Sequence, residues 1–377
     1  MKHKIVVLHG NESKKAVSAF VQRNEAYARW VAQLLDAQFV GTFDPHVTYS
    51  EPVYYVLART LVMGLQEAKS RGITTSDDFL GGIVPESYIG TKAITHQVLA
   101  HTTYKPASWS NGFPDAVKEV VLPGFTVFHN DDAKQAALHL FKQGAIRFKP
   151  AIGRSGRGPA VIHNIEELEY RLSQLGPDEL QTHGVVLEQQ LDDISTLSVG
   201  TLSLEGEHIS CYGKQRTTIN NQGNIDYGGS DLCCIRGTFD QLLQLEIPEH
   251  IRLAIKQAII YDNARHHYPD LLASRRNYDI GQGHDHKGNF YSGVLEHSWR
   301  IGGATGAELC AFEYFRKDAT ITCVEASTHC VFGEHTDLPP QARIQFNGRD
   351  SDFGPMKVYT VVGKILHGVN CDGEPSS

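Results

Sequence analysis

The sequence predicts a mixed α/β (α+β) fold on three observations. A short apolar run at 4–8 is followed by helical spacing over 16–37 and then by a second apolar run, which is the order of an α/β unit. Between 120 and 190, short apolar runs alternate with segments of helical spacing. Two later segments, 196–212 and 277–295, place strand-like residues on either side of a turn sequence and predict β-hairpins.

The other elements follow from the same patterns. Expected helices lie at 54–71, 91–101, 133–141, 165–174 and 248–264. Expected strands lie at 38–42, 80–84, 121–128, 145–150, 160–162, 184–188 and 358–362. Asp131 and Asp132 precede one of these helices and Asn164 precedes another, where helix-capping side chains are favoured. The segment 103–119 contains two prolines in a polar context and predicts a long loop.

The composition is that of a globular protein and argues against several classes of function. The chain has 377 residues, of which 41% are hydrophobic and 21% charged, and a formal net charge of −8. An acidic chain has no general attraction for nucleic acids or anionic membranes, so we expect neither as a partner. No apolar run approaches the roughly 18 residues of a membrane span, and the run near the start is too short for a signal peptide. We therefore expect a cytoplasmic protein. Its seven cysteines lack a CxxC pair and do not predict structural zinc or a disulfide framework.

A glycine-rich segment follows the expected strand at 145–150, with Lys149 at the end of that strand. The positions after it combine glycines, arginines and a serine: Gly153, Arg154, Ser155, Gly156, Arg157 and Gly158. Glycines let backbone N–H groups approach an anion closely, and arginines supply positive charge. The segment predicts a phosphate-binding loop, and a surface loop with solvated arginines would give the same pattern. Its spacing is not that of a P-loop.

The strand at 184–188 ends in a carboxylate, Glu188, which is followed by two amides and Leu191. Such a segment can offer a side-chain acceptor and backbone groups to the edge of an adenine, with Leu187 and Leu191 packing on its faces. The alternative interpretation is a strand that ends at the surface with Glu188 solvated.

The hairpin near residues 279–300 carries the most specific pattern. Asp279 and Glu296 can lie opposite each other across the hairpin, and Glu296, Ser298 and Arg300 alternate, so that they share one face of a strand. Oxygen ligands on one face suit Mg²⁺, and Arg300 would neutralise a phosphoryl group beside it. The alternative is a strand face with a Glu296–Arg300 salt bridge.

Taken in this order, the glycine-rich segment, the strand ending in Glu188 and the acidic hairpin resemble the ATP-grasp superfamily over roughly residues 89–308. The resemblance implies an ATP-grasp fold with an N-terminal Rossmann-like domain and an α+β lid. Only one glycine follows the first strand, so that domain does not carry a nicotinamide-binding fingerprint. The implied divisions are a pre-ATP-grasp domain at 1–88, the start of the core and a linker at 89–120, the lid at 121–190, the catalytic core at 191–345 and a C-terminal extension at 346–377.

The resemblance also implies roles for individual residues. ATP would be bound by Lys92, Lys149, Gly153, Ser155, Gly156, Arg157, Gly158, Glu188 and Leu191. The ligands of Mg²⁺ (or Mn²⁺) would be Asp279, Glu296 and Ser298. Arg300 and Lys149 would act on the phosphoryl group in transfer. Ser298 departs from the asparagine usual at this position, which weakens the case for a second metal ion.

The function that the resemblance implies is ATP-dependent ligation, in which a carboxylate is activated as an acyl phosphate and attacked by an amine or thiol. The expected partners are therefore small carboxylates and amines or thiols. Lys214, Arg216 and Arg236 are candidates for an anion clamp on the substrate, although solvated strand ends would look the same. A kinase-like or carboxylase-like enzyme and a nucleotide-binding regulatory protein remain as alternatives, and monomer and homodimer are both open.

Overall fold

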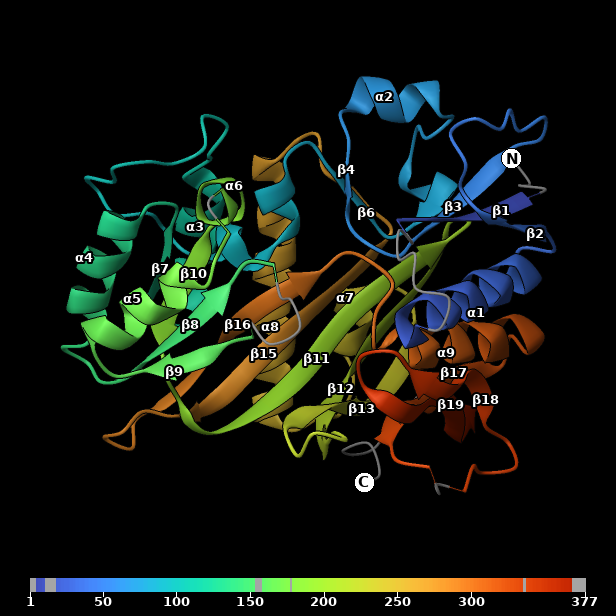
Figure 1. Cartoon of the computed structure of the whole chain (residues 1–377). Coiled ribbons are helices and arrows are strands. Elements are labelled where there is room, and N and C mark those ends of the chain that lie inside the picture. Colours follow the sequence, from blue (N-terminus) through green and yellow to red (C-terminus); the bar gives the residue numbers. More distant parts are fainter. Residues whose placement is uncertain (1–4, 11–17, 153–157, 177, 335–336, 368–377) are drawn as a thin grey trace.

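The computed structural model describes residues 5–10, 18–152, 158–176, 178–334 and 337–367. In this part of the chain, the strands form a parallel N-terminal sheet, a small three-stranded sheet, a four-stranded antiparallel sheet and a large eight-stranded sheet (Figure 1). No helix of these segments combines the length and hydropathy needed to cross a bilayer.

The N-terminal sheet has the strand order β2-β1-β3-β5 and is parallel. Its strands are β1 (Ile5–His9), β2 (Gln38–Thr42), β3 (Val53–Leu57) and β5 (Phe79–Leu80), with α1 (Ala19–Leu34), α2 (Leu65–Ser70) and η1 (Ser76–Asp78) between them. Beside it lie β4 (Leu61–Val62), β6 (Gly82–Val84) and β14 (Leu272–Ala273). The predicted strand–helix–strand unit is confirmed.

The predicted helix at 54–71 is wrong. Residues 53–57 form a strand and only 65–70 are helical. The segment VYYVL is almost wholly buried, and a central parallel strand is apolar on both faces. A continuous apolar run of this kind fits a helical template as readily as a strand.

The four-stranded sheet covers residues 124–189 and follows the prediction closely. Its order is β7-β10-β8-β9, all antiparallel. The strands are β7 (Gly124–Val127), β8 (Ile146–Pro150), β9 (Ala160–Ile162) and β10 (Val185–Gln189). Helices α4 (Asn130–Leu140), α5 (Ile165–Ser173) and α6 (Glu179–His183) accompany them. The side chain of Asn164 caps α5, as its position in the sequence predicts.

The large sheet has the order β16-β15-β11-β12-β13-β17-β19-β18. Its strands are β11 (Asp192–Leu204), β12 (Glu207–Ile219), β13 (Ile225–Arg236), β15 (Arg275–His284), β16 (Phe290–Ser298), β17 (Ile321–Phe332), β18 (Arg343–Asp350) and β19 (Gly354–His367). The accompanying helices are α7 (Phe239–Leu242), α8 (Glu249–Asn263), η5 (Ala264–His267) and α9 (Thr305–Lys317). Both predicted hairpins are present, β11–β12 and β15–β16. The sequence patterns did not predict β13, β17, β18 or α9.

The connection between the first and second sheets differs from the prediction. The expected helix at 91–101 is reduced to the 3₁₀ turn η3 (Lys92–Thr95), which follows η2 (Ser87–Gly90). The expected loop at 103–119 contains α3 (Gly112–Val117), followed by η4 (Lys118–Val120). Pro114 lies in the first turn of α3, where a missing N–H costs no hydrogen bond.

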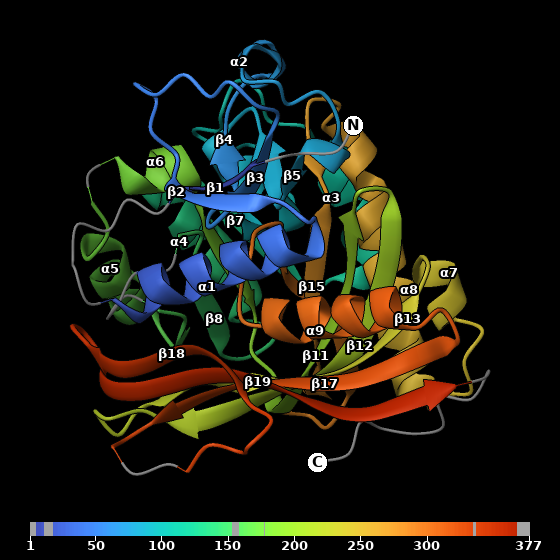
Figure 2. The same ribbon diagram turned by 90° about the vertical axis from the view of Figure 1, so that its right-hand side faces the viewer.

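The large sheet carries a hydrophobic core on each face. One core packs α8 and the β15–β16 side of the sheet against residues 84–128. On the other face, α1 and α9 lie side by side between the N-terminal sheet and the large sheet (Figure 2), and their apolar residues form one core with both sheets. The N-terminal sheet is therefore fixed against the end of β16, where the acidic hairpin ends.

Candidate functional site

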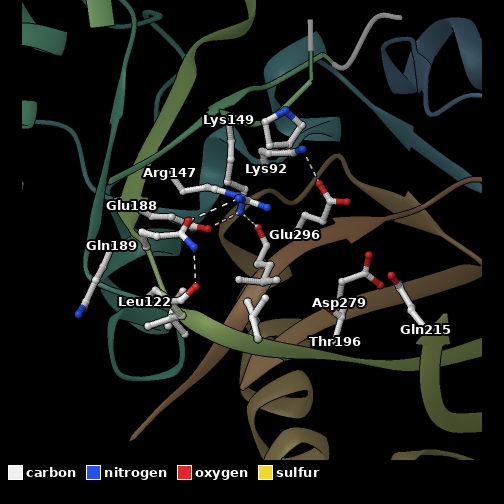
Figure 3. A pocket seen from close by; sticks show the side chains of 15 residues that line it. Lys92, Leu122, Arg147, Lys149, Glu188, Gln189, Thr196, Gln215, Asp279 and Glu296 are labelled. Carbon is white, nitrogen blue, oxygen red and sulfur yellow. Dashed lines mark hydrogen bonds and ion pairs between the residues drawn. The ribbon is translucent and has the colours of Figure 1, made fainter. Parts of the chain in front are cut away.

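A cavity of about 320 Å³ lies where the four-stranded sheet, the large sheet and η3 meet (Figure 3). Its lining comes from segments far apart in the sequence: Lys92, Leu122, Arg147, Lys149, Pro159, Glu188, Gln189, Gln190, Leu191, Ile194, Thr196, Gln215, Asp279, Leu295 and Glu296. The three motifs that the sequence analysis placed in order along the chain therefore contribute to one cavity.

Lys149 and Glu188 form a buried ion pair at one end of this cavity. Their strands are neighbours in the four-stranded sheet, and Lys149 Nζ lies 2.8 Å from Glu188 Oε1. The residues are 5% and 2% exposed. The ammonium also donates to the backbone oxygen of Leu295 on β16 at 2.7 Å, and His96 Nε2 lies 3.3 Å from the other Glu188 oxygen. Although burial acts to raise it, the Lys149 ammonium and His96 hold the pKa of Glu188 below its usual range. Glu188 is therefore not solvated, and that alternative interpretation is wrong.

Asp279 and Glu296 are direct cross-strand partners on β15 and β16. Directly opposed residues of an antiparallel pair project from the same face, and both side chains line the cavity (Figure 3). Glu296 Oε2 lies 2.5 Å from Lys92 Nζ on η3. Within the described segments Glu296 thus pairs with Lys92 and not with Arg300, so the salt-bridged strand face is not formed.

The two carboxyl groups respond in opposite directions to their surroundings. Burial, and then repulsion by Glu296, raises the pKa of Asp279 to about 7. Burial also acts against ionisation of Glu296, but the charges of Lys92, Lys149 and Arg300 lower its pKa to about 2. At neutral pH, Glu296 is ionised while Asp279 is close to half protonated, because two adjacent carboxylates repel each other.

This donor set fits a hard divalent cation. Two opposed carboxylates supply the oxygen ligands that Mg²⁺ prefers, and Asp279 Oδ1 has no hydrogen-bond partner in the described part of the chain. The raised pKa of Asp279 marks an uncompensated negative charge that a cation would relieve. Among the described residues, no group of three or more His, Cys, Asp or Glu side chains could hold a metal ion. A cation here would therefore complete its shell with phosphate and water oxygens.

The walls beside the ion pair are apolar. They are formed by Leu122, Leu191, Ile194 and Leu295. The expectation that Leu187 packs against a nucleotide is wrong, because its side chain is fully buried in the core of the four-stranded sheet. Successive residues of a strand point to opposite faces, so Leu187 and Glu188 cannot both enter the cavity.

The end of β16 is held by a buried ion pair that the sequence analysis missed. Arg275 on β15 contacts Glu308 on α9 at 2.6 and 2.9 Å, with both side chains almost completely buried. The same guanidinium donates to the backbone oxygens of Ser298 and Arg300. Neither Ser298 nor Arg300 lines the cavity. Ser298 is the last residue of β16 and Arg300 lies beyond its end, so the expectation that Glu296, Ser298 and Arg300 share one face of a strand is wrong for Arg300.

The three predicted substrate cations lie elsewhere on the large sheet. Lys214 lies on β12, opposite Leu197 of β11. Arg216 pairs with Asp231 at 3.0 Å and donates to the Thr328 oxygen. None of the three predicted cations lines the cavity.

Arg236 makes structural contacts. It donates to the backbone oxygens of Phe315, Asp318 and Ile321 and lies over the Phe315 ring. It therefore holds the end of α9 and does not converge with the other two cations.

Most of the glycine-rich segment lies outside the described residues. This applies to Gly153, Ser155, Gly156 and Arg157, whose roles stay predictions. Gly158 is described and exposed, and the next residue, Pro159, lines the cavity.

Two further functional candidates had no local signal in the sequence. His96 completes the surroundings of Glu188, and Gln215 on β12 lines the same cavity as Asp279 and acts to lower its pKa. Each becomes visible only when segments distant in the sequence are brought together.

Comparison with known proteins places the chain in a family. No curated protein matches it. A family model described as a protein of unknown function (DUF3182) matches residues 6–360. The chain belongs to the DUF3182 family.

Several solved structures resemble this DUF3182 protein. An N5-carboxyaminoimidazole ribonucleotide synthetase in its ADP complex is 13% identical, with a TM-score of 0.53 and coverage of 96% of this chain and 93% of that one. Phosphoribosylamine–glycine ligase from Thermotoga maritima is 13% identical, with a TM-score of 0.51 and coverage of 98% and 93%.

A third similar structure is the biotin carboxylase domain dimer of Hydrogenobacter thermophilus 2-oxoglutarate carboxylase, in complex with MgADP, ADP and bicarbonate. It is 12% identical, with a TM-score of 0.51 and coverage of 96% and 87%. Such identities concern the fold alone. This DUF3182 protein has the ATP-grasp fold, as the order of its motifs predicted.

Proposed function

We propose that this protein is an ATP-dependent ligase that activates a carboxylate as an acyl phosphate for attack by an amine or a thiol. One observation carries the proposal: two lysines and two opposed carboxylates converge on one cavity of an ATP-grasp fold. They are Lys92, Lys149, Asp279 and Glu296. Similar structures with ADP bound support a nucleotide in this cavity.

The parts of the cavity suit different parts of ATP. The apolar walls fit an adenine ring, and the segment from Glu188 to Leu191 offers polar groups at its edge. Because Lys149 neutralises the Glu188 carboxylate, an adenine amino group would share that carboxylate with the ammonium. Lys92 and Lys149 supply positive charge for the phosphates, and Pro159, which follows the glycine-rich segment, lines the same cavity.

Asp279 and Glu296 would hold Mg²⁺ (or Mn²⁺), with Ser298 as a further candidate ligand. When bound, the cation neutralises phosphate charge as the phosphoryl group is transferred. A cation on Glu296 would compete with Lys92 for this carboxylate, which would make the Lys92 ammonium more available to a phosphate oxygen. The buried Arg275–Glu308 pair holds the backbone of residues 298–300 and so keeps Arg300 beside the acids.

The reaction has two steps. A carboxylate oxygen attacks the γ-phosphorus, the bond to the β–γ bridging oxygen breaks, and ADP leaves with an acyl phosphate formed. An amine or thiol then attacks the acyl carbon, inorganic phosphate leaves, and the attacking group loses a proton. The protein mainly holds the reactants in line and balances their charge, since phosphoryl transfer asks for little covalent help.

The decisive experiment combines an ADP-release assay with a chemical trap. Purified protein is incubated with ATP, Mg²⁺, a panel of small carboxylates and hydroxylamine, which converts an acyl phosphate to a hydroxamate. We expect one class of carboxylate to raise ADP release and to yield hydroxamate in equal amount. ADP release with no hydroxamate for any carboxylate would contradict the ligase proposal, and phosphorylation of a hydroxyl compound would indicate a kinase.

The proposal retains the other expectations from the sequence. The expected partners are small molecules and the expected location is the cytoplasm. Sedimentation analysis would distinguish a monomer from a homodimer.

A further inference from the structure

Two arginines that have no role in the nucleotide cavity flank one aromatic ring. Arg23 is on α1 and Arg59 follows β3. Their guanidinium carbons lie 5.9 Å and 5.1 Å from the centroid of the Phe20 ring. Both positive charges therefore lie around the Phe20 ring, at the junction of the N-terminal sheet and α1.

This junction is next to the end of the acidic hairpin. The backbone N–H of Ile301 donates to the Leu57 oxygen at 3.1 Å, which fixes Arg300 beside the chain that leads to Arg59. Arg23 and Arg59 lie around the Phe20 ring, and this hydrogen bond brings the chain next to Arg300 to the same junction. We name Arg23, Arg59 and Arg300 the arginine cluster.

The turn after Arg300 allows close packing on the other side of the cluster. A Cβ at Gly302 would lie 3.3 Å from Arg300 Nη1, and a Cβ at Gly303 would lie 2.5 Å from the Tyr227 hydroxyl. The chain joins the cluster to the proposed metal ligands, because Arg300 follows Ser298 by two residues. The 13-residue helix α9 begins just beyond this turn, and its N-terminus adds partial positive charge.

In the part of the chain that the structure describes, none of the three guanidinium groups of the cluster forms an ion pair with a carboxylate, whereas Arg275 is fully paired with Glu308. Arg23 Nε is buried without a hydrogen-bond partner in the same part of the chain. A buried donor with no acceptor is costly unless a ligand supplies one.

We propose that Arg23 and Arg59, beside Arg300, bind a second anionic group of the substrate, so that the carboxylic acid activated by this enzyme carries an additional carboxylate or phosphate. The statement that a carboxylic acid is activated rests on the proposed function. The statement that the arginines bind an anion does not. In this arrangement Arg300 would act at the reacting end of the substrate, while Arg23 and Arg59 would select the remote charge. Guanidinium groups suit this task because they bind carboxylate and phosphate oxygens in a bidentate manner.

Calorimetry on the full chain, saturated with Mg²⁺ and a non-hydrolysable ATP analogue, tests the anion site directly. The probes are succinate, inorganic phosphate and propionate. We expect succinate or phosphate to bind at least about tenfold more tightly than propionate, and the preferred probe distinguishes a second carboxylate from a phosphate. Arg23→Gln and Arg59→Gln should each weaken the preferred dianion by about tenfold, the scale of one charge-assisted hydrogen bond, and leave propionate unchanged.

A matched control comes from the same helix. Arg29 is exposed and also lies over a phenylalanine, at 4.6 Å from the Phe39 ring, but it is not in the cluster. Arg29→Gln should bind all three probes as the parent does. Arg23→Lys, which keeps the charge, should recover part of the dianion affinity. A fall in melting temperature with unchanged dianion affinity would instead assign Arg23 and Arg59 a structural role.

The outcomes separate this inference from the proposed function. If a monocarboxylate supports hydroxamate formation and the Arg23 and Arg59 variants use it with an unchanged KM, with no preference for dianions, the ligase stands and this inference fails. If dianions bind through the two arginines but no carboxylate stimulates ADP release, the anion site stands and the ligase proposal fails.

Discussion

Asp279 and Glu296 face each other directly across β15 and β16, yet their pKa values are displaced in opposite directions. Glu296 is close to Lys92, while Asp279 has a carboxyl oxygen without a hydrogen-bond partner among the described residues. The pair therefore holds one firmly ionised acid and one acid that is easily protonated.

Replacing Glu296 should stop turnover without removing the nucleotide site. Glu296→Gln deletes one proposed metal ligand, and loss of a charge-stabilising contact in the transition state costs about 3 kcal/mol, or at least about a hundredfold in kcat. Binding of the ATP analogue in EDTA should change by only a few fold. The measurements are ADP release and calorimetry.

The control for this variant is Glu166→Gln, which removes an exposed carboxylate on α5. It should behave as the parent does. An unchanged ATPase activity in Glu296→Gln would refute the metal assignment.

Lys149 should contribute to both nucleotide affinity and folding. Lys149→Met removes the ammonium from the cavity and leaves the buried Glu188 with His96 alone. We expect at least about tenfold weaker binding of the ATP analogue and a loss of stability on the order of 3 kcal/mol, because an unpaired buried charge is strongly destabilising.

The double variant Lys149→Met/Glu188→Gln separates these two effects. It neutralises the orphaned carboxylate and should recover much of the free energy of unfolding in denaturant titrations, while affinity stays low. If the single variant binds the analogue as the parent does, Lys149 is not a phosphate ligand.

The pH dependence of stability should reveal Asp279. Its carboxyl pKa is about 7 in the folded chain against 3.8 when unfolded, so the folded state binds the proton more tightly and stability falls as pH rises from about 4 to 7. Asp279→Asn removes this loss. In protein free of nucleotide and metal, its melting temperature relative to the parent should therefore rise by about 2 °C or more between pH 5 and pH 8.

Glu296 does not mask this effect. Its pKa is lowered, so its contribution is complete above pH 4.5 and is lost only as pH falls toward 2. Asp240→Asn, at an exposed position on α7, is the control and should give no such divergence. Parallel melting curves for Asp279→Asn and the parent across this range would contradict the raised pKa.

The buried ion pair of Arg275 and Glu308 should dominate the stability of the region around α9. Glu308→Gln leaves a buried guanidinium without its counter-charge and should lower the free energy of unfolding by about 3 kcal/mol. Glu67→Gln removes the exposed partner of Arg71 one helical turn away and should cost less than about 1 kcal/mol. Equal effects of the two variants in urea titrations would show that burial of the first pair is not decisive.

The sequence predicted best where the signal was local. Three motifs could be recognised from a few consecutive residues each: the glycine-rich segment, the strand ending in Glu188 and the acidic hairpin. The pairing of β15 with β16 could be predicted because a single turn joins them. The order of these motifs then led to the ATP-grasp fold, which the solved structures support.

Features that depend on distant segments escaped prediction. His96 and Gln215 reach the cavity through tertiary packing, and the pairing of Arg275 with Glu308 spans two elements of which one, α9, was not predicted. The helix expected at 54–71 is wrong because the local pattern is ambiguous. A buried parallel strand lacks the alternation of polar and apolar residues that would distinguish it from an apolar helix face. Lys214 and Arg216 were chosen for their charge alone, which does not determine the direction of a side chain.

The hydrogen bond from Lys149 to the Leu295 oxygen has a mechanical consequence. This hydrogen bond connects the four-stranded sheet to the eight-stranded sheet across the cavity, so the two sheets can separate only when it breaks. An incoming triphosphate would compete for the same ammonium. If ATP binds here as proposed, the Lys149 ammonium would bond either to the Leu295 oxygen or to a phosphate, so nucleotide binding would be coupled to the contact between the two sheets.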